Sequence, residues 1–487
     1  MCFVPFNVGD WRSNIMFFET ADTVIKAVSN VLYQPWLVPL LLVMGGIFFT
    51  IRCRGIQIGM FKEACRVIME KPDNENSISS FGALMVSTAS RVGTGNIIGV
   101  STAICIGGAG AIFWMWITAF IGGATAFVES TLAQIYKKKN PDGSCYGGPA
   151  FYMQDALKKR WLGVIFSVLI ILIYALGYNM LAAYNLQTTF ITFSFYNEKT
   201  TPVIIGIILM VLFGAIILGG AKRLSKITEI LVPIMGVAYV AVSLIVLGVN
   251  VHNIPSMFGK IFSSAFDFKA IFGGFAGSCI LYGVKRGLYS NEAGMGSAPN
   301  AAATADVSHP AKQGLVQMLS VFIDTILICT ATAFMCLSTN VVPTKDIAGA
   351  VYVQNALGEA LGSFGPIFLT AAMMVFAFTT LIGNYSYCEG CLEFIIKRAP
   401  KKSEIIIFRL AASAVIFVGT ISSAELVWDL AEMLQGLIVI VNVPCIFVLS
   451  GVAVKCLNDY RKQLKDGKNP HFKAKDIELK VKTDFWN

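Results

Sequence analysis

The sequence predicts an all-α membrane protein, and three observations support this prediction. Hydrophobic residues make up 55% of the 487 residues and charged residues only 14%, whereas a soluble globule carries about 25% charged residues. The apolar residues gather in long segments, with short clusters of lysine and arginine between them. Two of these segments are interrupted by glycines. The apolar excess is therefore expected to face lipid.

A helix needs about 20 mostly apolar residues to cross a bilayer. About eleven such segments are present, at 36–51, 81–106, 111–136, 161–193, 203–220, 226–248, 270–298, 312–338, 363–387, 403–424 and 428–455. The first is short and the fourth is long, so we expect tilt or an interfacial turn there.

Lysines and arginines of the loops collect on one side, which marks that side as cytoplasmic. With the first helix entering from outside, the cytoplasmic side receives most of them, including Lys138 and Lys401, and we also place Lys285, Arg286 and Lys312 there. The opposite side receives only Arg12, Lys26, Lys199, Lys260, Lys269 and Lys345. This bias predicts an odd number of spans, with the N-terminus outside and the C-terminus in the cytoplasm.

Three regions follow from this pattern. Residues 1–75 form an extracellular N-terminal segment, a peripheral first helix and a basic cytoplasmic loop. Residues 76–455 form a ten-helix core, and residues 456–487 form a basic cytoplasmic tail. Glycines interrupt the first and sixth core helices, at 90–96 and 273–278. Breaks at corresponding positions of two five-helix halves indicate a 5+5 inverted-repeat transporter core.

The first interruption, Val92-Gly93-Thr94-Gly95-Asn96, suits a zwitterion beside a cation. Glycines let the helix unwind, which frees backbone N–H and C=O groups at mid-membrane depth. The N–H groups at a helix start attract a carboxylate, and carbonyl oxygens attract a hard cation such as Na⁺. Close helix packing is the competing interpretation.

Other polar residues in the apolar segments are further candidates. The adjacent hydroxyls of Thr379 and Thr380 either hold a cation or bond to carbonyls of the preceding turn. Ionisable groups inside a membrane are functional candidates by default. Arg91 is expected to pair with Asp324 as a structural bridge or to act in gating, and Glu129 lies near the cytoplasmic face.

The run from Gly283 to Pro299 is rich in helix-breaking and capping residues. From its residues alone it predicts a helix end, with Ser290 as a cap and Glu292 in the first turn of a short helix.

Three stretches resemble the alanine or glycine:cation symporter family: VGTGNIIGVSTAI, GAIFWMWITAFIGGATAFVESTLAQIY and GVKRGLYSNEAGMGSAPNAAATA. The resemblance runs from about residue 36 to 455. It implies a bacterial or archaeal sodium or proton symporter with a leucine-transporter-type fold, in which one extra helix precedes a ten-helix core.

The resemblance also implies site residues. Backbone amides of Thr94 and Gly95 should hold the substrate carboxylate. The sodium site should comprise the carbonyls of Ala89 and Val92, Asn96, and the hydroxyls of Thr379 and Thr380. The pocket should be completed by Phe275, Gly277 and Ser278.

Substrate preference is expected to depend on Asn384, where many relatives carry tryptophan, and on Ala182, where many carry glutamine. The loss of a large ring makes room for a substrate larger than alanine, such as glutamine.

The sequence therefore predicts a sodium-coupled symporter that carries small neutral amino acids, alanine or glycine, into the cell by alternating access. Sodium:glutamine symport and proton coupling are the alternatives. An enzyme is not expected, because the three histidines fall in loops or the tail and no nucleophile–base spacing is present. We expect no cofactor besides the coupling ion, no nucleic acid partner, a monomer, and a place in the plasma (inner) membrane.

Overall fold

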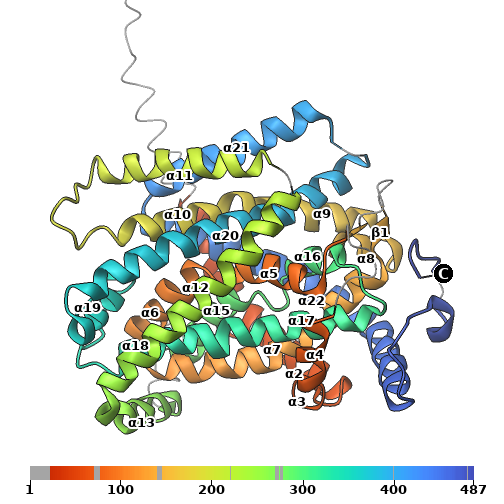
Figure 1. The fold of residues 1–487 in the computed structure, drawn as a ribbon, viewed down its shortest axis with the longest axis horizontal. Helices are drawn as coiled ribbons and strands as arrows, with labels where there is room; N and C mark the ends of the chain where they lie inside the picture. The colour runs from red at the N-terminus through yellow and green to blue at the C-terminus, as the bar shows by residue number, and fades with distance from the viewer. Residues whose placement is uncertain are drawn as a thin grey trace, which may run out of the picture.

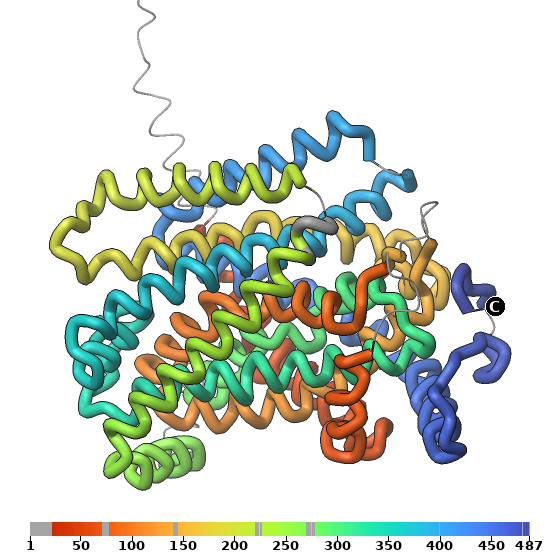
Figure 2. The backbone as a smooth tube through the Cα atoms, viewed as in Figure 1, coloured from red at the N-terminus to blue at the C-terminus, as the bar shows by residue number. Residues whose placement is uncertain are grey.

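The computed structural model describes residues 22–70, 77–139, 145–219, 221–268, 274, 278–398, 400–479 and 481–486. These residues form a bundle of long helices that run side by side across the molecule (Figure 1). Figure 2 shows the same path as a tube, in which segments far apart in the sequence lie next to each other.

The helices and strands of the first half are α2 (Val38–Arg52), α3 (Ile56–Gly59), α4 (Phe61–Ile68), α5 (Ser80–Arg91), η1 (Gly95–Gly99), α6 (Val100–Thr102), η2 (Ala103–Gly107), α7 (Gly110–Ile135), β1 (Lys138–Lys139), β2 (Cys145–Tyr146), α8 (Pro149–Asp155), α9 (Arg160–Ile170), η3 (Ile171–Gly177), α10 (Tyr178–Thr188), α11 (Thr201–Ile217) and α12 (Ala221–Val249). Those of the second half are η4 (Val251–Asn253), α13 (Ile254–Ala265), α15 (Cys279–Asn291), α16 (Ala298–Thr304), α17 (Pro310–Val321), η6 (Phe322–Cys329), α18 (Thr330–Leu337), η7 (Lys345–Ile347), α19 (Ala350–Leu361), α20 (Phe364–Ile396), α21 (Lys402–Thr420), α22 (Ala424–Lys465) and η8 (Ala474–Ile477).

Seven helical stretches of the described chain are long and apolar enough to cross a membrane: Gly110–Ile135, Arg160–Thr188, Lys226–Val249, Pro310–Leu337, Phe364–Ile396, Lys402–Thr420 and Ala424–Lys465. Shorter apolar helices cover Val38–Arg52, Gly95–Gly107 and Thr201–Ile217. The prediction of an all-α membrane protein is confirmed at this level, while the count of eleven spans stays a prediction.

Two core helices are interrupted. The first break separates α5 from η1 at Val92–Thr94, within the segment that the sequence predicts. The second separates α15 from α16, where Glu292 has φ +56°, Gly294 φ +93° and Gly296 φ +74°. These left-handed values end the helix, since L-residues other than glycine rarely adopt them.

The predicted second break, at residues 273–278, falls largely outside the described residues and stays a prediction. Of residues 273–278 the structure describes Gly274 and Ser278, and Ser278 begins α15 as its N-cap, accepting a hydrogen bond from the Leu281 N–H at 3.3 Å. The interpretation of Ser290 as a cap is wrong, because Ser290 lies inside α15 and Glu292 closes that helix.

The bundle has two distinct ends. Helices α13 and α19 lie at one end, and α4, α8 and strand β1 lie at the other (Figure 1). Strand β1 pairs antiparallel with β2, with Lys138 opposite Tyr146.

The basic residues of α15 and α17 do not share one end. Lys285 pairs with Glu432 near the start of α22, whereas Lys312 contacts Asn469, which follows the end of α22. The assignment of Lys285 and Arg286 to the same side as Lys312 is therefore wrong.

Candidate functional site

At the first break, a side-chain oxygen takes the place of a backbone carbonyl as hydrogen-bond acceptor. The Gly93 N–H donates to Asn96 Oδ1 at 2.8 Å, and the Asn96 N–H donates to the Gly93 carbonyl at 3.2 Å. In a continued α-helix these two N–H groups would bond the carbonyls of Ala89 and Val92, four residues back. The break therefore releases both carbonyls for another partner.

Helix α20 packs directly against this break. A Cβ on Gly383 would overlap the Ser90 backbone, and a Cβ on Gly93 would overlap Thr380 Oγ1. Only glycine permits these approaches. Thr380 Oγ1 is buried and has no hydrogen-bond partner within the described chain. Thr379 Oγ1 bonds to the carbonyls of Val375 and Phe376, at 2.9 and 3.0 Å.

The residues that open η1 are also enclosed. Thr94 Oγ1 accepts a hydrogen bond from Asn185 Nδ2 at 3.2 Å. A Cβ on Gly95 would overlap the ring of Tyr289, so this ring covers the glycine directly. The rings of Tyr178 and Trp428 pack edge-on against Tyr289, with centroid distances of 4.9 and 5.3 Å.

Asn96 also ties the break to the π-helical stretch η6. Its Nδ2 lies 2.7 Å from Asp324 Oδ1, and Ser290 Oγ donates to Asp324 Oδ2 at 2.6 Å. All three residues are buried. Asp324 thus receives hydrogen bonds from both broken helices.

Asn384 belongs to a buried polar chain that joins four helices. It donates to Asn179 Oδ1 at 3.0 Å and lies 2.7 Å from Ser90 Oγ. Ser90 Oγ is also 3.2 Å from Glu292 Oε1, and Glu292 Oε2 accepts from Ser297 Oγ at 2.7 Å. Glu292 and Ser297 border the second break, so this chain connects both breaks.

The second break is held from two further helices. Glu129 on α7 accepts from Asn442 Nδ2 at 3.0 Å and from the Gly294 N–H at 3.5 Å. Asn442 on α22 also donates to the Gly294 carbonyl at 3.0 Å. Glu129 is fully buried within the protein, and its place near the cytoplasmic face stays a prediction.

Arg91 is 2% exposed and lies beside the first break. Its Nη1 donates to the Gln317 carbonyl at 3.4 Å and to Gln317 Oε1 at 3.5 Å. The structure records no ion pair between Arg91 and Asp324, which overturns the predicted bridge. Its Nε and Nη2 have no partner within the described residues.

Ion pairs close the end of the bundle where α22 begins. Glu432 accepts from Lys285 Nζ at 2.9 Å and from Arg286 Nη2 at 3.0 Å. The Arg286 guanidinium also lies 4.0 Å from the ring centroid of Trp428. These contacts join the same two helices as the packing of Tyr289, on α15, against Trp428, on α22.

The predicted site residues fall into three groups. The first group lies at the first break and comprises Ala89, Val92, Thr94, Gly95, Asn96, Thr379, Thr380 and Asn384. Ser90, Asn179, Glu292 and Asp324 lie there with them. Phe275 and Gly277 lie outside the described residues. Ser278 lies at the start of α15, a full helix away from the second break.

Ser90, Asn179, Glu292 and Asn442 were not predicted from the sequence as site residues. They meet partners far away in the sequence: Glu292 is 202 residues from Ser90, Asn179 is 205 from Asn384, and Asn442 is 148 from Gly294. The signal that could have found Glu292 is the glycine pair Gly294 and Gly296, which follows it in the SNEAGMGSAP run.

A bundle of apolar helices with two breaks, joined by buried polar side chains and closed by ion pairs, defines a membrane transporter rather than an enzyme. The comparisons with known proteins give the family. The model of the sodium:alanine symporter family matches residues 18–474, and the chain belongs to this family.

Two relatives illustrate its range. A protein of Bacillus subtilis (strain 168) with the name "Probable sodium/glutamine symporter GlnT" is 44% identical over 456 residues, covering 93% of each chain. The "Sodium/alanine symporter AgcS" of Methanococcus maripaludis is 38% identical over 454 residues, covering 90% of this chain and 98% of its own.

A solved structure supports the fold alone. The chain superposes on MhsT, crystallised with L-phenylalanine, with a TM-score of 0.56 at 15% identity, over 85% of this chain and 94% of that one. The chain is thus a symporter with a transporter fold of this type.

Proposed function

We propose that the protein is a sodium-coupled symporter that moves a small neutral amino acid, alanine or glycine, into the cell by alternating access. One observation carries this proposal. The first break releases the carbonyls of Ala89 and Val92 beside the hydroxyl of Thr380, which has no hydrogen-bond partner within the described chain. Oxygen atoms to which no protein group donates a hydrogen bond suit a hard cation.

The proposed sodium ligands are the oxygens of Ala89, Val92, Thr379 and Thr380. The Thr379 hydroxyl donates its proton to a carbonyl of its own helix, which leaves its oxygen lone pairs free for a cation. Asn96 serves the ion indirectly, because its Oδ1 takes the Gly93 N–H that would otherwise bond Ala89.

The proposed carboxylate site is at Thr94 and Gly95, where η1 begins. N–H groups at a helix start carry partial positive charge and bind anions. The ring of Tyr289 lies against Gly95, so this ring would cover the carboxylate. Oxygens at the second break, Glu292–Ser297, would receive the substrate ammonium.

Glutamine is the alternative substrate, and it is supported by the side-chain amide nitrogen of Asn179. Both ends of the Asn384 amide already have protein partners, Ser90 and Asn179. Asn179 Nδ2, however, is buried and has no partner within the described chain. A side-chain carbonyl of glutamine could accept from it, so Asn384 would act by orienting Asn179.

Proton coupling is the alternative to sodium. Asp324 and Glu292 are buried carboxyl groups bonded to the breaks, and a proton could replace the ion there. We further propose that the chain works as a monomer in the plasma membrane, with N-terminus outside, C-terminus inside and a 5+5 inverted-repeat core.

The test is uptake of a radiolabelled amino acid panel by proteoliposomes, with and without an inward sodium gradient. We expect alanine or glycine uptake that the gradient drives and that collapse of the gradient abolishes. Uptake driven equally by a proton gradient without sodium would overturn sodium coupling. A panel in which glutamine alone is transported would select the alternative substrate.

A further inference from the structure

Beyond α22, the chain turns back against the bundle end that carries α4 and α8 (Figure 1). We call residues 466–479 and 481–486 the C-terminal segment. Its apolar side chains are packed, since Phe472, Ile477 and Trp486 are at most 7% exposed. The Ala474 N–H donates to the Trp486 carbonyl at 2.7 Å, which closes the segment on itself.

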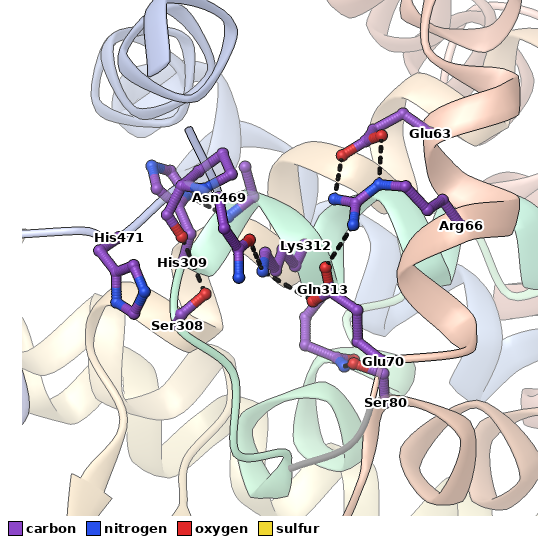
Figure 3. A network of polar contacts seen from close by, with 12 residues as sticks. Glu63, Arg66, Glu70, Ser80, Ser308, His309, Lys312, Gln313, Asn469 and His471 are labelled. Atoms are coloured by element: carbon purple, nitrogen blue, oxygen red, sulfur yellow. Dashed lines mark hydrogen bonds and ion pairs between the residues drawn. The ribbon is translucent and has the colours of Figure 1, made fainter. Parts of the chain in front are cut away.

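The segment binds the connection between α16 and α17. The Phe472 N–H donates to the Ser308 carbonyl at 2.9 Å, and Ser308 Oγ donates to the Pro470 carbonyl at 2.8 Å. Lys312 Nζ donates to Asn469 Oδ1 at 2.8 Å (Figure 3). These contacts fix the segment to the residues that follow the second broken helix.

The segment also binds the end of α7. Trp486 Nε1 donates to the Gln134 carbonyl at 2.8 Å. The Lys137 ammonium lies 4.2 Å from the ring centroid of Phe485 and 5.0 Å from that of Trp486. Such ammonium–ring contacts are stronger when water is excluded, and Lys137 is fully buried. Burial lowers the pKa of Lys137.

The side chains of Gln134, at the end of α7, and Lys137, just after it, hold the end of α16. Gln134 Nε2 and Lys137 Nζ each donate to the Ala305 carbonyl at 3.0 Å. The Asp306 N–H donates to the Ile78 carbonyl at 2.9 Å, just before α5 begins. The ends of α5 and α16, which belong to the two broken helices, are therefore joined directly beside the segment.

A polar cavity lies in this region. It measures about 150 Å³ and is lined by Glu70, Ser80, Asp306, Val307, Ser308, Lys312 and Asn469. Glu70 and Asn469 reach Lys312 from opposite sides (Figure 3). The segment lies next to the junction of α5 with α16, because it binds Ser308 and because its Asn469 lines the same cavity as Ser80 and Asp306.

We infer that the C-terminal segment is a latch. It stabilises the conformation in which α5 and α16 are joined, and it has to release Ser308 and Gln134 before the site opens at this end. This inference rests on the proposed function, because only a transporter needs that opening.

The test uses the full chain with Phe472→Ala and Trp486→Ala together, and Lys475→Ala as the control at an exposed position of the same segment. Hydrogen–deuterium exchange in liposomes is followed at residues 78–84 and 302–312. We expect at least tenfold faster exchange there in the double variant and wild-type exchange in the control. The half-saturating outside concentration of substrate should rise about threefold or more.

Two outcomes would overturn the latch. One is wild-type exchange at both regions in the double variant. The other is faster exchange throughout the chain with a lower Tm, which makes the segment part of the folding core only. Exchange is measured without transport, so a wild-type protein that fails to transport amino acids with sodium overturns the proposed function and not this result.

Discussion

Thr379 and Thr380 are adjacent, yet their hydroxyls differ in a way that separates their roles. Thr379 bonds to its own helix, and Thr380 has no partner within the described chain. Thr380→Val keeps the shape and removes a free oxygen ligand. We expect it to raise the half-saturating sodium concentration about tenfold, since a hydrogen-bond-type contact to a charge contributes about 1.5–3 kcal/mol.

Thr379→Val is the matched control and should have the smaller effect. Both variants are compared in proteoliposome uptake at varied sodium, with Tm showing that the fold is kept. No effect of either change would place the ion elsewhere, and an equal rise for both would show that the two hydroxyls contribute alike.

Asn384 offers a second prediction at the residue scale. Tryptophan has an indole N–H but no acceptor, so at this position it cannot accept from Ser90, and its larger ring displaces the amide that donates to Asn179 Oδ1. Each buried group left without a partner costs about 1–3 kcal/mol. We therefore expect Asn384→Trp to reduce alanine and glutamine uptake by similar factors. Competition of labelled alanine by unlabelled glutamine measures the ratio, and a selective loss of glutamine binding would show that Asn384 touches the substrate itself.

At the scale of elements, the ion pairs of α15 with α22 close one end of the bundle. Glu432→Gln leaves Lys285 and Arg286 without their carboxylate, and removal of one partner of a buried pair costs about 3–5 kcal/mol. We expect a lower Tm. The Tyr282 ring centroid lies 5.9 Å from the Arg286 guanidinium, so we also expect faster thiol labelling of Tyr282→Cys in the Glu432→Gln background. Glu425→Gln, at an exposed position in the first turn of α22, should leave both measurements unchanged.

The two breaks show what the sequence could predict. The first was found because its glycines and polar residues stand together, and Gly93 and Gly95 are needed where Thr380 and Tyr289 approach the backbone. The break at 292–296 was not predicted, because it depends on contacts across the chain. Glu129 and Asn442 are 313 residues apart and meet at Gly294.

Local glycine content gave no such information. Residues 273–278 are as rich in glycine as the break at 292–296, and of them the structure describes Gly274 and Ser278, which caps the start of α15. The apolar segments were predictable because their length and composition determine where a helix can face lipid. The polar partners within the bundle follow from packing, which one sequence does not reveal.

At the scale of the whole molecule, the bundle ends can be assigned to sides of the membrane. Lys260 on α13 and Lys345 on η7 belong to one end, and Lys138 on β1 belongs to the other (Figure 1). We expect an impermeant thiol reagent outside the cell to label Lys260→Cys and Lys345→Cys, but not Lys138→Cys or Lys401→Cys. Cys65 is the exposed cysteine of the described chain, so Cys65→Ser is the background. The reverse pattern would overturn the predicted orientation.

Helix α22 contacts three of the features described above. Glu432, Asn442 and Asp459 lie along it, and at about 1.5 Å per residue the first and last are about 40 Å apart. They touch the ion pair at one end, the second break in the middle, and His309 at the other end. Pro444 stands beside Asn442 within this helix, and proline removes one helical hydrogen bond and permits a bend. A bend at Pro444, at the level of the second break, would therefore change the position of the ion pair at Glu432 relative to the contact of Asp459 with His309.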